Sequence, residues 1–95
     1  MNDILTLWHV HRDAGWPVVS NIHEGELMTL DTVISGCVVY FLESEEGLDQ
    51  QRIDMLRSCL DDLNGLLPDL PEESGPYFAR LQRLADLLLA ANRTE

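Results

Sequence analysis

The densest group of side chains that could bind a metal lies near the N-terminus of the chain. It consists of His9, His11, His23, Glu24 and Glu26. Zinc requires three or four nitrogen, sulfur or oxygen ligands that converge within bonding distance. The HVH segment would place two imidazoles on one side only in a strand, and HEGE lacks the second histidine of the HExxH zinc motif. We therefore predict no metal site and no cofactor.

The two cysteines are the other candidates for chemistry. A nucleophilic cysteine needs a nearby base and access to solvent. Cys37 and Cys59 both lie within apolar periodic segments, and no histidine is close to either in the sequence. We interpret both as reduced structural thiols. Because the sequence contains no glycine-rich phosphate loop either, we predict that the protein is not an enzyme.

Asp31 is the only charged residue between Leu27 and Leu42. A buried carboxylate is stable only when it is paired, hydrogen-bonded or protonated. One interpretation is that Asp31 lies at the end of a helical bundle, where it is hydrated or paired with an arginine. The other is a polar site lined by Asp31, Thr32 and Ser35.

The charge of the chain limits its partners. Seventeen acidic residues stand against six arginines and no lysine, which gives a net charge of −11. Nucleic acid and anionic lipid are bound by neutralising phosphates, so we expect neither as a partner. The acidic surface fits either solubility or docking on a basic protein. The candidate docking residues are Glu43, Glu45, Glu46, Asp54, Asp61 and Asp62.

The N-terminal segment MNDILTLWHVHRD lacks the basic leader and apolar core of a signal peptide. The longest apolar run, from Thr32 to Leu42, is eleven residues, whereas a membrane span needs about 20. With two reduced thiols, the chain is expected to be cytoplasmic and not membrane-bound.

Two segments in the second half have the apolar spacing of an amphipathic α-helix. The first stripe consists of Ile53, Leu56, Leu60, Leu63 and Leu67. The second consists of Tyr77, Leu81, Leu84 and Leu88, widened by Phe78, Ala85 and Leu89. Leu60 is at the centre of the first stripe, so we predict that it is a core residue.

Residues typical of helix ends border these segments. Asp49 is a candidate N-cap for the first, and Pro68 disfavours its continuation. Pro76 suits the first position of the second helix, and Arg93 would complement the helix dipole in its last turn. Asn21 is a candidate cap for an earlier helix.

That earlier helix covers Leu27 to Leu42. Its main apolar stripe consists of Leu27, Leu30, Ile34, Cys37 and Phe41. Val33, Val38, Val39 and Leu42 fall outside that stripe, which is typical of a helix that is buried on nearly all sides. Only a narrow row of small residues remains, namely Gly25, Thr29, Thr32 and Gly36. A strand is the competing interpretation, because VISGCVVYF is rich in β-branched and aromatic residues. We favour the helix because the periodic pattern is long.

The first twenty residues fit two structures. A helix would place Ile4, Leu7, Trp8 and His11 on one face, while alternation of apolar and polar residues would fit a strand. The DAGWP segment ends either one.

These observations predict one helical domain over residues 1–95. Its fold would be a small antiparallel bundle of three main helices plus a short N-terminal element, with an α+β fold as the alternative. The helix from Leu27 to Leu42 has more apolar surface than its neighbours can cover. We therefore predict a homodimer with Val38, Val39 and Leu42 at its interface.

The function predicted from the sequence is protein–protein contact without catalysis. One alternative is an acidic inhibitor or immunity-type protein, acting as a nucleic-acid mimic on a basic partner. The other is a small metal-binding protein or enzyme built around the histidines. The sequence indicates neither a biological process nor the identity of a partner or substrate.

Overall fold

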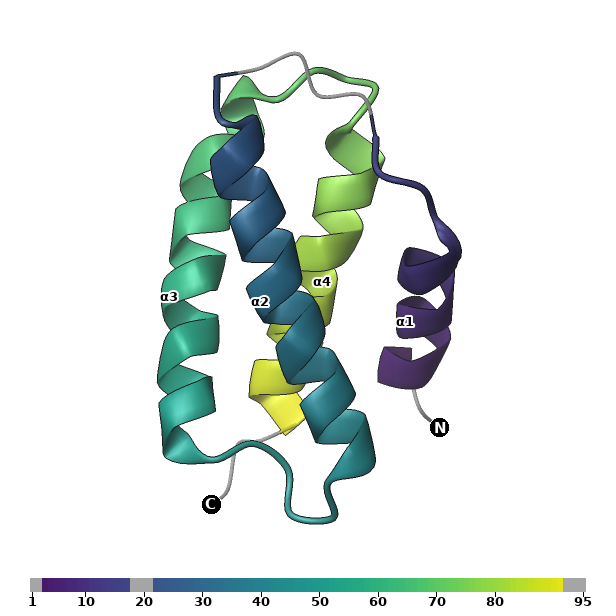
Figure 1. Cartoon of the computed structure of the whole chain (residues 1–95), viewed down its shortest axis with the longest axis vertical. Helices are drawn as coiled ribbons and strands as arrows, with labels where there is room; N and C mark the ends of the chain where they lie inside the picture. The colour runs from purple at the N-terminus through teal and green to yellow at the C-terminus, as the bar shows by residue number, and fades with distance from the viewer. Residues whose placement is uncertain (1–2, 18–21, 92–95) are drawn as a thin grey trace.

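The computed structural model describes residues 3–17 and 22–91. Its helices are α1 (Asp3–Asp13), α2 (Glu24–Glu43), α3 (Gln50–Leu66) and α4 (Gly75–Ala91), and a short 3₁₀ helix, η1 (Leu67–Asp69), follows α3. Successive α-helices run in opposite directions along the bundle (Figure 1). No strand occurs in the described ranges, so the all-α bundle is confirmed and the α+β alternative is wrong. The predicted helix-end residues Asn21 and Arg93 lie outside those ranges.

The ends of α3 follow the local sequence signals. The Asp49 carboxylate accepts a hydrogen bond from the Arg52 backbone N–H across 2.8 Å, which confirms the predicted N-cap. The helix ends at Leu66, two residues before Pro68. In the loop before α3, Gly47 has a φ of 80°, a conformation that side chains other than glycine rarely adopt.

The predicted stripes form one core between the helices. Residues from α2, α3 and α4 supply most of it: Leu27, Leu30, Ile34, Cys37, Val38, Leu56, Leu60, Leu63, Phe78, Leu81, Leu84, Ala85 and Leu88. Leu60 is buried, as predicted from its central position. Burial of these apolar side chains is the main driving force for folding of the bundle.

The N-terminal element is a helix, so the strand interpretation of this segment is wrong. α1 lies beside α4 (Figure 1). Ile4 and His11 are buried, and Leu7 and Trp8 are partly buried against the core, as the helical interpretation predicted. The face that packs is therefore the one identified from the spacing of these four residues.

Within the single chain α2 is buried along one side only, and the prediction that a second copy covers the remainder stays a prediction. Only 28% of its most apolar stretch is buried. Among the described helices, α2 alone is long and apolar enough to cross a membrane, although no single apolar run in it reaches that length. A core helix of a soluble protein meets the same criteria. The other half of α2 faces away from the bundle.

Candidate functional site

A polar network inside the bundle joins side chains from three helices. It consists of His11, Asp31, Tyr77 and Arg80. His11 Nε2 lies 2.9 Å from Asp31 Oδ1, and the Tyr77 hydroxyl donates to Asp31 Oδ2 across 3.0 Å. Arg80 Nε donates to His11 Nδ1 across 3.1 Å. The network therefore links α1 and α4 in two ways. Arg80 of α4 binds His11 of α1 directly, and Tyr77 of α4 and His11 both bind Asp31 of α2.

The hydrogen bonds determine where the His11 proton lies. Arginine Nε always carries a hydrogen and can only donate, so His11 Nδ1 must be the acceptor. The ring hydrogen is then on Nε2, which donates to the Asp31 carboxylate. The geometry thus corresponds to a neutral imidazole between an anion and a cation.

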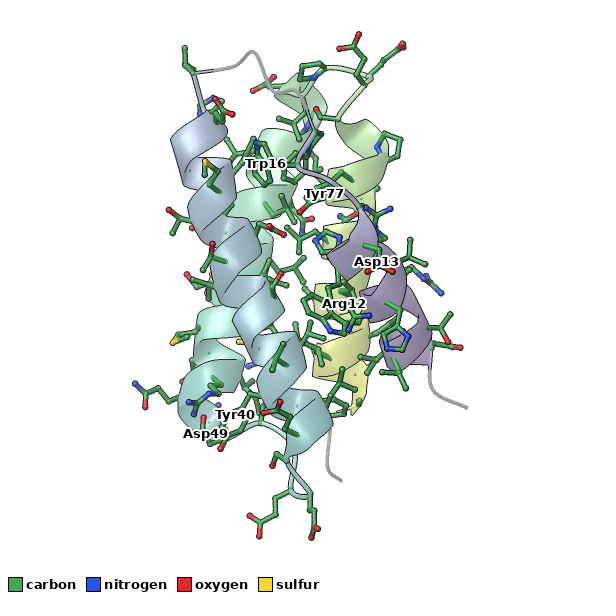
Figure 2. All side chains as sticks on the ribbon, turned by 45° about the vertical axis from the view of Figure 1, so that its right-hand side comes forward. Arg12, Asp13, Trp16, Tyr40, Asp49 and Tyr77 are labelled. Carbon is green, nitrogen blue, oxygen red and sulfur yellow. The ribbon has the colours of Figure 1, made fainter. Side chains whose placement is uncertain are left out.

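Aromatic rings surround the imidazole. The centroid of the Tyr77 ring is 4.4 Å from that of His11, and the Trp8 ring lies at 6.2 Å. Trp16 packs edge-on against Tyr77 at 5.6 Å, near one end of the bundle (Figure 2). His11 is almost fully buried, whereas the Asp31 side chain is 19% exposed. The hydrogen bonds are therefore largely shielded from water, which strengthens them.

The four side chains of the network partner one another across three helices. Both ring nitrogens of His11 and both oxygens of Asp31 already have partners in the structure. We interpret the four residues as a polar cross-link between α1, α2 and α4.

Asp31 therefore occupies a different environment from the two that were predicted. It is paired with a histidine and a tyrosine, and not directly with an arginine. Thr32 does not share its site, because the Thr32 side chain is exposed and its hydroxyl donates to the Met28 carbonyl. The sequence indicated one of the two partners, because a helix over the N-terminal segment places His11 on the same face as the apolar residues Ile4, Leu7 and Trp8.

We expect the Tyr77 phenol to remain protonated where an ordinary tyrosine ionises. Burial raises the pKa of Tyr77 well above its usual value of 10.0, and the charge and hydrogen bond of Asp31 raise it further. Because the pKa of Tyr77 is higher in the folded than in the unfolded chain, the protonated phenol contributes fully to folding stability below about pH 10. That contribution is lost as the pH rises further. The absorbance change at 295 nm up to about pH 11 should be equal in the unmodified protein and Tyr77→Phe. A smaller change in the variant would contradict this environment.

A second feature is the outward side of α2. Its exposed residues between Leu27 and Leu42 carry no charge, and we call them the α2 face: Met28, Thr29, Thr32, Gly36, Val39 and Tyr40. A shallow groove runs between this face and α3, where Met55 contributes a partly exposed side chain. At one end the Arg52 guanidinium stacks on the Tyr40 ring at 3.8 Å while it pairs with Asp49 (Figure 2).

The predicted interface residues separate into two kinds. Val38 has no exposed surface and belongs to the core, so its prediction as an interface residue is corrected. It was misplaced because it lies just outside the predicted main stripe, next to buried Cys37, and spacing alone did not show which side of that stripe is covered. Val39 is 38% exposed on the α2 face, and Leu42 is partly buried against the core.

The candidate docking acids are all exposed. Glu43, Glu45 and Glu46 lie at the end of α2 and in the loop after it, while Asp54, Asp61 and Asp62 lie on α3. The Gln50 side-chain amide donates to Asp54 across 2.9 Å. No acidic residue belongs to the α2 face, so the acidic and uncharged surfaces are made of different residues.

The metal and thiol candidates are dispersed. His9 is exposed, His11 is buried, and His23 approaches Glu26 at 3.7 Å. Within residues 3–17 and 22–91, no three histidine, cysteine or acidic side chains are placed to hold a metal ion. Both cysteines are free thiols, and burial raises the pKa of each, which lowers their reactivity at neutral pH.

Comparison with protein-family models, curated proteins and solved structures found no match.

Proposed function

We propose that the protein acts through protein–protein contact without catalysis, and that a second copy of the chain docks on the α2 face. The observation that carries the proposal is the contrast between this face and the rest of the chain. Its six exposed residues are uncharged in a protein with a net charge of −11. Exposed apolar surface that gathers on one face is typical of an interaction site, and Met28, Val39 and Tyr40 supply it here.

The side chains of the face suit close contact with a second helix. The Thr29 hydroxyl donates to the Gly25 carbonyl across 3.2 Å, and Thr32 donates likewise to Met28 across 2.9 Å. Both hydroxyl hydrogens are thus satisfied within α2, and burial of these side chains leaves no donor without a partner. Gly36 lacks a side chain, and nothing lies within 4 Å of the position that a Cβ would take there.

The larger side chains supply the apolar area. Met28, Val39 and Tyr40 are exposed on α2, and Met55 is exposed across the groove. Twofold pairing would bury all four on both chains, because one self-complementary patch then serves each copy. The small residues between them would let the two backbones approach closely.

The charge of the chain opposes this association but does not prevent it. The nearest charged residues on the exposed side of α2 lie at its ends, Glu26 and Glu43. Repulsion between exposed charges is screened over about 8 Å at physiological ionic strength. Association of two acidic chains should therefore strengthen as salt is added.

Val39→Glu is expected to convert the dimer to a monomer while the helix content stays unchanged. The change places a carboxylate within the paired faces, where burial would desolvate it. Val10→Glu is the matched control, because Val10 is 51% exposed on α1 and the substitution alters the net charge equally. Sedimentation equilibrium with circular dichroism measures both properties. Equal masses for the two variants would contradict the proposed interface.

A further inference from the structure

We infer that His11 is a protonation switch that holds Arg80 against α1 when the ring is neutral and releases it when the ring is charged. The His11 Nδ1 atom accepts the Arg80 Nε hydrogen across 3.1 Å. A protonated imidazole carries hydrogens on both nitrogens and has no acceptor. Protonation at Nδ1 would therefore break the hydrogen bond from Arg80, because the Nδ1–H and the Arg80 Nε–H would both be donors facing each other.

The charges around His11 decide which contact breaks. The charged and titratable groups that face the ring are Asp31 from α2, and Tyr77 and Arg80 from α4. On α1 itself, Arg12 is exposed and pairs with Asp13 at 3.5 Å. A charged imidazole keeps its hydrogen bond to the Asp31 carboxylate and gains Coulomb attraction to it. Repulsion acts only between His11 and Arg80.

Arg80 is the group that is able to move. Arg80 is partly exposed to solvent, whereas His11 is buried between its own helix, α2 and α4. Its guanidinium lies 5.3 Å from the Tyr77 ring centroid, and a long arginine side chain can turn its charged end to water at low cost. Protonation thus removes the direct polar link between α1 and α4, while both helices stay connected to Asp31 of α2 through His11 and Tyr77.

The switch links pH to the attachment of the N-terminal helix. While the His11 ring is neutral, α1 is held by both Asp31 and Arg80, and when the ring is protonated α1 is held by Asp31 alone. Since α1 is attached by few other buried side chains, its contact with α4 should loosen when His11 is protonated.

Nitrogen-15 NMR of the full-length protein tests the switch directly. At about pH 8 the His11 ring should show hydrogen on Nε2 and none on Nδ1, and the Arg80 Nε–H signal should be protected from exchange. As the pH falls, that protection should disappear with the same midpoint as His11 protonation. A ring with hydrogen on Nδ1 at about pH 8, or protection that persists after protonation, would overturn the inference.

Arg80→Met provides an independent readout, because methionine retains the apolar stem and removes the charge. If release of Arg80 is what loosens α1, backbone amide exchange in α1 should no longer depend on His11 protonation in this variant. Exchange in α1 that still rises on protonation as much as in the unmodified protein would overturn the inference.

Discussion

Asp31→Ala is expected to lower the free energy of unfolding by about 3 kcal/mol. The carboxylate accepts hydrogen bonds from His11 and Tyr77, and bonds to a charged acceptor contribute roughly 1.5–3 kcal/mol each. Its partial exposure lowers that contribution, but the substitution also leaves two enclosed donors without partners. Chemical denaturation at one fixed protein concentration measures the change.

Asp61→Ala is the matched control for this variant. Asp61 is exposed on α3, and its removal alters the net charge of the chain by the same amount. Because a surface substitution of this kind shifts stability by about 0.5 kcal/mol or less, the two variants should differ clearly. Equal losses would mean that the Asp31 hydrogen bonds contribute nothing to the stability of the fold.

Leu60→Ala is expected to lower the free energy of unfolding by about 2–5 kcal/mol. Leu60 lies in the core between α3 and the neighbouring helices and is only 8% exposed. Truncation removes buried apolar surface and leaves a cavity that the helices can fill only in part. In a bundle of this size the loss would be a large share of the total stability.

Ile22→Ala is the control, because it removes apolar side-chain atoms from the surface and not from the core. Ile22 is 94% exposed, so its truncation removes almost no buried surface and should change stability by about 0.5 kcal/mol or less. If Leu60→Ala unfolds at the same denaturant concentration as the unmodified protein, the buried side of α3 has been assigned incorrectly.

The helices of the second half could be predicted because their signals are local. Leu56, Leu60 and Leu63 recur at helical spacing, and Asp49 caps the helix three residues before the N–H that it binds. α2 could be identified as a helix, and the main stripe predicted for it is buried at Leu27, Leu30, Ile34 and Cys37. Spacing alone could not show which residues beside that stripe are covered, so it did not separate inward-facing Val38 from outward-facing Val39.

The polar network could not be predicted, because its contacts join residues far apart in the chain. His11 and Asp31 are 20 positions apart, Asp31 and Tyr77 are 46 apart, and His11 and Arg80 are 69 apart. Which side chains meet depends on how the helices pack, and no motif in the sequence specifies that arrangement. Asp31 was identified as unusual from its isolated charge, but its partners required the fold.

Association of two chains through the α2 face would double the mass of the unmodified protein in solution. Light scattering at micromolar concentrations should give a mass near twice 10.8 kDa. The dimer fraction should rise from low salt to about 0.5 M NaCl, because added salt screens the repulsion between two acidic chains. A mass of 10.8 kDa at every concentration and salt level would contradict the account.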